Sequence, residues 1–372
     1  MGNAELTLER LRPLTSDNFE HIKNDHFKPA FDIPGLKYFR DKARNERDLR
    51  ELYRERALYE LLQNADDSKA TQACFILTTD GLAFAHDGSW FTVGNFINLA
   101  DGWSDKDPNQ CIGHKGLGFR SVLDMTPSPY LVKGDKSSFL GLKFSYALNY
   151  NCLQQGFKAK PQLKYEYDQW TPNGQRACPV MAIPGLAKKI SLGSCSRVLE
   201  SLVADNSGSN FTTLFWFPAK DGDIDATLKD LDPMPMLSDQ SGRARLAIFV
   251  QDEATRVLPF LNSITRIAAF DQSTKLSETL VKDKLTKDGC GDSVLAVEVD
   301  GVREETRFSQ IRKTYRIDEG IKKEPGMPKA VQLLEEAAIV LSVSLNTDKP
   351  RTLNDGNTIQ RLRHSGSRRI ER

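Results

Sequence analysis

One helical segment, Leu58–Ser68 (LYELLQNADDS), constrains the fold more than any other stretch of the chain. Because an α-helix has about 3.6 residues per turn, residues spaced i, i+4 and i+7 share a face. This spacing places the side-chain oxygens of Glu60, Asn64 and Asp67 on one face. The opposite face carries the apolar residues Leu58, Leu61, Leu62 and Ala65. The segment therefore predicts a helix that packs one side into a core and presents carboxylate and amide groups on the other.

Two interpretations of this polar face stay open on the segment alone. No basic residue lies three or four positions after Glu60, whereas a solvated helix face usually mixes Lys and Arg with its acidic residues. The pattern therefore suits a site for a metal ion and a nucleotide. The same letters also fit an ordinary amphipathic helix on the surface of a globular protein.

Composition narrows the class of protein. The chain has 372 residues, enough for a large core and two domains, and its net charge of +1 gives no bulk field for nucleic acid or an anionic membrane. The 6 cysteines form no C-x-x-C pair, which argues against zinc and predicts reduced thiols. No apolar run reaches the roughly 18 residues that span a bilayer, and no signal-peptide pattern is present. We expect a cytoplasmic protein, or a nuclear one in a eukaryote, without membrane contact.

Hydrophobic patterning predicts the secondary structure. Helices are expected near Ser16–Lys23, at Thr92–Ala100, at Phe119–Met125, and over Tyr38–Ser68 as one long helix or two abutting ones. Strands are expected at Ala73–Thr79, Leu82–Ala85, Phe139–Leu148, Leu163–Tyr167, Val180–Ile183, Phe211–Phe217 and Ala244–Val250, with Leu258–Ile267 following. Leu295–Val299 and Glu304–Arg316 continue a β-rich second unit, and Ala330–Leu345 reads as a helix followed by a strand.

A glycine-rich segment, CIGHKGLGFRSVLD, spans Cys111–Asp124. Gly113, Gly116 and Gly118 form a G-x-x-G-x-G pattern directly before an expected helix. Glycines there let backbone N–H groups close on an anion, and the helix dipole favours negative charge. Lys115 and Arg120 add positive charge. The segment is neither a Walker A loop nor a dinucleotide fingerprint, because the order of its glycines differs from both.

Four features now occur in order: a helix with E-x-x-x-N-A-D-D, a strand ending in H-D-G, the glycine-rich loop, and a later strand containing Thr212 and Thr213. This order resembles the Bergerat-fold ATPases, the class of gyrase and the ninety-kilodalton heat-shock chaperone. The sequence segments ELLQNADDS, HDGSWF and IGHKGLGFRSVLD are most similar to those of the sacsin and NO VEIN branch, and this similarity covers about residues 45–135. The resemblance implies an α/β two-layer sandwich with a mixed, mostly antiparallel sheet, helices on one face and ATP between the layers.

The same resemblance divides the chain into four parts. Residues 1–37 form an N-terminal arm, 38–235 the ATP-binding domain, and 236–349 a smaller, partial transducer-like α/β domain. Residues 350–372 form a basic tail, expected to be disordered because it has six arginines and few apolar residues. The tail does not establish nucleic-acid binding.

Site roles follow from the resemblance residue by residue. Glu60 corresponds to the glutamate that polarises the attacking water, and Asn64 to the asparagine that ligates Mg²⁺ between the phosphates. Asp67 corresponds to the carboxylate on the ribose and adenine side. The lid hinge and phosphate contacts correspond to Gly113, Lys115, Gly116, Leu117, Gly118 and Phe119. Thr212, together with Thr213, corresponds to the strand threonine near adenine.

The sequence departs from the family at the base-reading position. The family places an aspartate first in a D-x-G motif, whereas alignment on Gly88 puts His86 there and Asp87 directly before the glycine. Either His86 substitutes for the aspartate or Asp87 takes its role through a shifted turn. The family usually supplies a further catalytic lysine or arginine, the transducer cation, from the domain that follows. Its candidates here are Arg256, Arg266 and Lys313, and the sequence does not choose among them.

Two functions remain in competition at this point. The first is a Mg²⁺-dependent ATPase of slow turnover, whose lid over Gly102–Gly118 closes on ATP and promotes engagement of a protein partner or a homodimer, as in a chaperone. The second is a non-catalytic scaffold on the same fold that binds nucleotide weakly or not at all. His86 favours the scaffold, whereas Glu60 and Asn64 together favour the ATPase.

Overall fold

The computed structural model is an α/β fold built on one mixed sheet. It describes residues 12–32, 37–53, 56–89, 91–101, 118–134, 139–170, 178–188, 194–198, 211–224, 257–271, 276–282, 289–299, 302–323 and 336–345. Within these residues the sheet has 11 strands in the order β11-β10-β9-β8-β7-β1-β2-β6-β3-β4-β5. The β1–β7 pair is parallel, and the other strand pairs between described residues are antiparallel.

The elements have the following bounds. The strands are β1 (Gln72–Leu77), β2 (Gly81–His86), β3 (Tyr130–Gly134), β4 (Phe139–Lys143), β5 (Gly185–Leu186), β6 (Thr213–Pro218), β7 (Arg266–Asp271), β8 (Leu276–Lys282), β9 (Gly289–Val299), β10 (Val302–Arg316) and β11 (Glu336–Leu345). The α-helices are α2 (Ser16–Asp32), α3 (Lys37–Tyr53), α4 (Ala57–Asp67), α5 (Val93–Asp101), α6 (Tyr146–Ala159), α7 (Gln162–Trp170) and α12 (Glu319–Lys322). The short 3₁₀ helices are η2 (Gly118–Asp124), η5 (Lys220–Gly222) and η8 (Leu258–Phe260).

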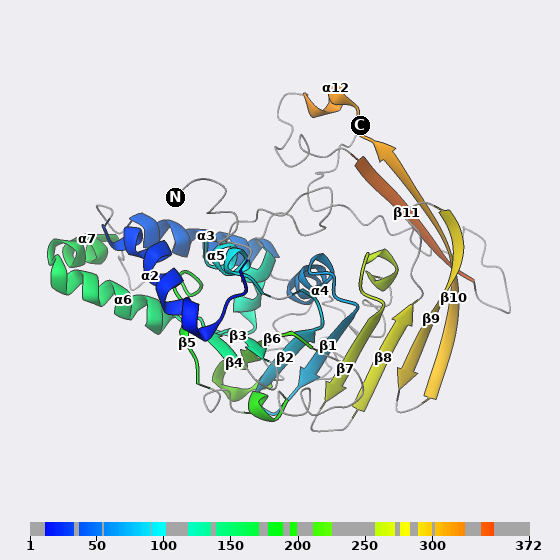
Figure 1. Ribbon diagram of the computed structural model, residues 1–372, viewed down its shortest axis with the longest axis horizontal. Coiled ribbons are helices and arrows are strands. Elements are labelled where there is room, and N and C mark those ends of the chain that lie inside the picture. The colour runs from blue at the N-terminus through cyan, green and yellow to red at the C-terminus, as the bar shows by residue number, and fades with distance from the viewer. Residues whose placement is uncertain are drawn as a thin grey trace.

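Helices α2 to α7 lie with the β1–β6 part of the sheet, while β8 to β11 curve away on the other side (Figure 1). Strand side chains alternate between the two faces, so the central strands β1, β2, β3, β6 and β7 each contribute to two separate clusters. Phe75, Phe84 and Phe215 belong to the larger cluster, which also contains buried residues of the helices. Cys74 and Trp216 face the other way and pack in a second, smaller cluster. The helical layer therefore covers one defined face of the central strands.

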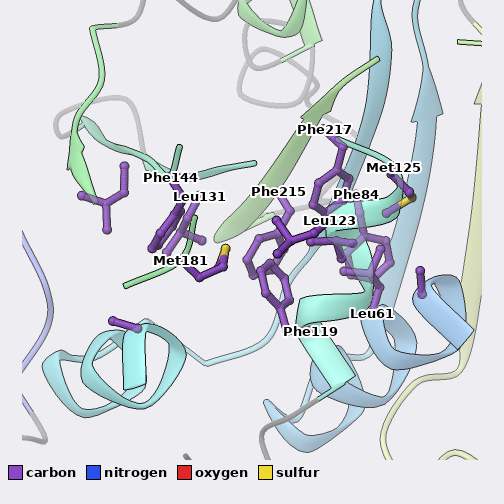
Figure 2. Close-up of a cluster of buried hydrophobic side chains, with 14 of the residues drawn as sticks. Leu61, Phe84, Phe119, Leu123, Met125, Leu131, Phe144, Met181, Phe215 and Phe217 are labelled. Carbon is purple, nitrogen blue, oxygen red and sulfur yellow. The ribbon is translucent and has the colours of Figure 1, made fainter. Parts of the chain in front are cut away.

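The larger cluster joins segments that are far apart in sequence. Figure 2 shows Leu61 of α4, Phe119 and Leu123 of η2, and Phe215 and Phe217 of β6 in one group. The Phe119 ring centroid lies 4.9 Å from that of Phe215 and 6.5 Å from that of Phe217. Such tilted aromatic pairs stabilise a core beyond the area that they bury. This packing fixes η2 between α4 and the sheet.

Helix α3 is held by charged groups rather than by an apolar stripe alone. Its Glu46 carboxylate accepts hydrogen bonds from the main-chain N–H groups of Val180 and Met181, both at 2.7 Å. Burial raises the pKa of Glu46, while the nearby Arg120 and the two N–H groups act in the opposite direction. On the next turn, Arg50 Nε lies 2.5 Å from Asp124 Oδ1 at the end of η2. These contacts anchor α3 to the segment that contains Val180 and Met181 and to the end of η2.

The structure confirms much of the secondary structure expected before residue 135, and also the later strand expected at 211–217. Strands β1, β2 and β6 and helix α5 match the expected segments, and Tyr38–Ser68 is two abutting helices, α3 and α4. Helix α2 is longer than expected, and residues 118–124 form a 3₁₀ rather than an α-helix. Strands β3 and β8 were not expected from the sequence.

Three expected strands are wrong. Phe139–Leu148 divides into β4 and the start of α6, because Ser145 caps a helix by accepting the N–H of Leu148. Leu163–Tyr167 lies inside α7, where Lys164 and Asp168 form an i, i+4 ion pair at 2.5 Å. Val180–Ile183 is irregular and is held by Glu46 and by the side chain of Asn149.

The strands expected in the second unit extend the first sheet. Strand β7 pairs with β1 in parallel over residues 266–271, and β8 to β11 continue from it. The segment expected to form a strand at 244–250, residues 330–335 and the tail 350–372 lie outside the described residues. The domain boundaries expected from the sequence stay predictions. Within the described ranges, none of the helices has both the length and the apolar character needed to cross a membrane.

A buried carboxylate ties the two parts of this sheet together. Asp66, near the end of α4, is 1% exposed. Its Oδ2 accepts the N–H of Asn262 at 2.9 Å, and its Oδ1 accepts those of Ser263 at 2.6 Å and Ile264 at 3.0 Å. These residues lead directly into β7. We call this contact the Asp66 clamp.

We expect Asp66→Ala to lower the free energy of unfolding by about 3 kcal/mol, because it leaves three N–H groups without their charged acceptor. The control is Asp48→Ala on α3, whose carboxylate is 56% exposed and lies 3.7 Å from Arg44 and Arg47. That change should stay within about 0.5 kcal/mol of the wild type. Denaturant unfolding measures both, and equal losses in the two variants would contradict the clamp.

Candidate functional site

Helix α4 exposes Asn64 and Asp67 as the spacing predicts, but it buries Glu60. Leu61 and Leu62 are fully buried, whereas Asn64 and Asp67 are partly exposed. Glu60 is 7% exposed, and its carboxylate lies 3.5 Å from a guanidinium nitrogen of Arg56. Arg56, one turn before Glu60, is thus a basic neighbour of this carboxylate, whereas the sequence has none three or four positions after it.

The C-terminal end of α4 lies directly against the turn that follows β2. Ser89 N–H donates to Ser68 O at 2.6 Å. A Cβ atom on Gly88 would lie 2.8 Å from Ser68 O and 2.9 Å from Ser68 Cβ, so a side chain there would push the turn away from the helix. Glycine at position 88 thus allows the H-D-G segment to approach the helix that carries Asn64.

The structure gives different contacts to the two residues that compete for the base-reading position. Asp87 accepts hydrogen bonds from Thr71 N at 2.8 Å, Thr71 Oγ1 at 2.5 Å and Gln72 N at 2.9 Å. This carboxylate therefore fastens the end of β2 to the start of β1. His86 is 4% exposed, and its Nδ1 accepts the N–H of Gly88 at 3.2 Å.

The threonines at the start of β6 complete this part of the site. Thr212 Oγ1 donates to Gly88 O at 2.6 Å, and Thr212 N–H donates to His86 O at 3.0 Å. Thr213 is opposite His86 in the ladder and is 3% exposed. Its hydroxyl has no hydrogen-bond partner among the described residues. The H-D-G turn is thus held by Thr212, while Thr213 offers an unused polar atom beside His86.

The glycine-rich loop is described only at its end. Gly113, Lys115, Gly116 and Leu117 lie outside the described residues, as does the lid segment expected over 102–117. Gly118 begins η2, and α4 packs against η2. Phe119 lies in the aromatic cluster with Phe215, so the position that it occupies is in the core.

Two buried cations, Arg120 and Lys133, have contacts that the sequence did not predict. Arg120, expected only to add charge to the loop, donates from Nη2 to Leu99 O at 3.2 Å and Ala100 O at 3.1 Å near the end of α5. Lys133 on β3 is 5% exposed and was not singled out. The signal was its place in YLVKG, where alternation from Leu131 puts position 133 on the core face.

The three residues considered as a transducer cation have different surroundings. Arg256 lies outside the described residues, and Arg266 is an exposed residue of β7. Lys313 is exposed on β10 with its ammonium 5.4 Å from the ring centroid of Tyr315. The choice among them stays open.

The donor set fits Mg²⁺ only as part of a nucleotide complex. Within the described ranges, no group of three or more His, Cys, Asp or Glu side chains could hold a metal ion. Asn64 supplies one amide oxygen on a partly exposed helix face. Mg²⁺ often keeps several waters and takes one or two protein oxygens plus phosphates, so this single donor is compatible with such a site.

Comparison with known proteins adds no further support for a family. No protein-family model matches the chain, and no curated protein matches it. The likeness to Bergerat-fold ATPases therefore depends on the motifs and on where the described residues bring them together.

Proposed function

We propose that this chain has a Bergerat-type nucleotide site and binds Mg²⁺ with a purine nucleoside triphosphate, ATP in the first instance. Slow hydrolysis to the diphosphate and phosphate would follow. Closure of the loop before Gly118 on the nucleotide would couple binding to a protein partner or a second copy, in a chaperone-like role. This last step concerns residues outside the described ranges and remains an expectation from the resemblance.

The observation that carries the proposal is the meeting of three distant motifs around α4. The helix carries Glu60 and Asn64, its C-terminal end contacts Gly88 through Ser68, and it packs against η2, which begins at Gly118. A helix that only covered a core would not need an acidic and an amide group beside a glycine turn and a glycine loop. A site for phosphates, a metal ion and a base would need all of them.

The chemistry expected of each residue is simple. Phosphoryl transfer needs positioning and charge neutralisation more than covalent help from the protein. Bound Mg²⁺ would neutralise phosphate charge, with Asn64 as its protein ligand. Glu60 lies one helical turn before Asn64, and its carboxylate would orient a water molecule toward the terminal phosphate.

A scaffold without hydrolysis remains the second candidate, and one observation favours it. Asp87, the nearest aspartate to the base-reading position, is already engaged with Thr71 and Gln72. A fold that kept this arrangement for structure alone would bind nucleotide weakly. The two candidates differ in measurable affinity and in turnover.

Asn64→Ala should abolish the Mg²⁺-dependent part of nucleotide binding. The wild type should lose affinity at least tenfold when EDTA replaces Mg²⁺, whereas the variant should bind equally weakly in both buffers. The main-chain oxygen of Asn64, which alanine retains, accepts the hydrogen bonds of Ser68, and the melting temperature without nucleotide reports whether the variant is folded. Calorimetry with ATP makes the measurement, and a variant with full Mg²⁺ dependence would remove Asn64 from the site.

Glu60→Gln should lower the hydrolysis rate at least a hundredfold and leave the nucleotide affinity within about threefold, because the amide keeps the size of the side chain but cannot act as a base. Glu20→Gln on α2 is the control, since that carboxylate is half exposed and contacts only Lys23 among the ion pairs of the described residues. Steady-state phosphate release measures the rate. Equal turnover in the wild type and Glu60→Gln would favour the scaffold.

A further inference from the structure

The two edges of the sheet are built differently. Among the described strands, β5 lies at one end of the sheet and β11 at the other, and each of them pairs with a single neighbour. Strand β5 has only 2 residues, whereas β11 has 10 and pairs with β10 along its whole length (Figure 1). A very short edge strand offers few main-chain groups to a second chain, which protects that edge from pairing. Strand β11 has no such protection from its length.

Strand β11 also lacks the other features that keep sheet edges from pairing. Its sequence, EAAIVLSVSL, has one charged residue, Glu336 at its first position, and no proline or glycine. Its register with β10 runs without interruption from Glu336 to Leu345, so no bulge turns this edge away. Natural edge strands usually carry lysines, prolines or bulges, because alternate residues direct their N–H and C=O groups outward. The composition of β11 is therefore suited to pairing with another strand.

The sheet face beside this edge carries exposed apolar side chains. Ile311 and Tyr315 on β10 are 48% and 45% exposed, and Ile339 on β11 is 53% exposed. Ile339 is the ladder partner of Lys313, which lies between the two β10 residues in sequence, so all of them belong to one face. Single exposed apolar residues are common, but neighbouring ones at the edge of a sheet indicate a contact surface. A strand added beside β11 would continue this face and cover part of Ile339.

The sequence of β11 is complementary to itself when two copies run antiparallel. With position 341 opposite itself, all pairs on the face of Ile339 are apolar in sequence: Leu341 with Leu341, Ile339 with Val343, and Ala337 with Leu345. A shift by two residues is the smallest that keeps the faces aligned. In one direction it places Leu345 opposite Glu335, and in the other Ala337 opposite Thr347. The arrangement centred on position 341 is therefore the best matched.

The chain that follows β11 is less suited to the same edge than a second β11. Residues 346–372 contain Pro350 and are rich in arginine and other polar residues, with few of the β-branched and aromatic residues typical of strands. Pairing with a second copy also satisfies the symmetry of a dimer, because a two-fold axis brings the same surface of both copies together.

From these features we infer that β11 is a homodimer interface, at which the β11 strands of two copies pair antiparallel about Leu341 and join two sheets into one. Main-chain hydrogen bonds supply the affinity of such a contact, and the matched side chains supply its register. The pairing needs no nucleotide. It is therefore independent of the proposed site around α4, and either proposal can fail without the other.

Sedimentation equilibrium of the full chain without nucleotide measures the association. We expect a dimer for the wild type, and one that stays monomeric up to about 100 μM overturns the inference. Leu341→Lys and Leu341→Glu should each raise the dissociation constant of the dimer at least about tenfold, because like charges then lie directly opposite at the two-fold axis. An equimolar mixture of the two variants should form a heterodimer, since lysine then faces glutamate. A mixture that stays as weak as the separate variants contradicts this register.

Cysteine substitutions test the register with smaller changes. Leu341→Cys should form a covalent dimer on mild oxidation with diamide, because residues directly opposite have Cβ atoms within roughly 5.5 Å of each other. Ile339→Cys is the matched control, which should crosslink no more than the wild type but should crosslink when mixed with Val343→Cys. Denaturing electrophoresis without reductant measures the products. Crosslinking of Ile339→Cys alone, or none of Leu341→Cys, would show that the strands do not pair about Leu341.

A last variant separates pairing at the edge from packing of two sheets face to face. Ile311→Lys places a charge on the exposed face, one strand inside the edge. It should leave the dissociation constant of the dimer within about threefold of the wild type, because β10 does not contact the second copy in the inferred arrangement. If this variant keeps the wild-type melting temperature but dissociates as readily as Leu341→Lys, the face and not the edge is the interface, and the inference is wrong.

Discussion

The fold depends on a single carboxylate that joins residues far apart in the chain. Asp66 satisfies three consecutive main-chain N–H groups in the turn before β7, and β7 then pairs with β1 in parallel. Parallel neighbours cannot be joined by a tight turn, so their alignment has to be set by contacts outside the ladder. The Asp66 carboxylate at the end of α4 sets it. Every later strand, from β8 to β11, is added to the edge that this contact defines.

Helix α4 consequently has a different partner on each side. Leu61 and Leu62 contribute to the core, Asp66 holds the turn before β7, Ser68 contacts Gly88, and the exposed side carries Asn64. Such a helix cannot shift without changing the position of β7 relative to β1. If a nucleotide binds beside Asn64, a displacement of α4 would therefore reach the start of β7 through the contacts of Asp66.

The sequence predicted what periodicity and turn chemistry determine, and it failed where a local signal was overridden or overlooked. The faces of α4 and the strands β1, β2 and β6 follow directly from their apolar patterns. The aromatic residues of 139–167 resemble strand residues in composition, and only the capping role of Ser145 would have indicated a helix. The sequence could not separate Asp66 from Asp67, because adjacent carboxylates look alike until the distant turn at 262–264 is placed. The motifs of the candidate site were visible in the sequence, but the register that places Thr213 opposite both His86 and Lys133 was not, since ladder register is not a local property.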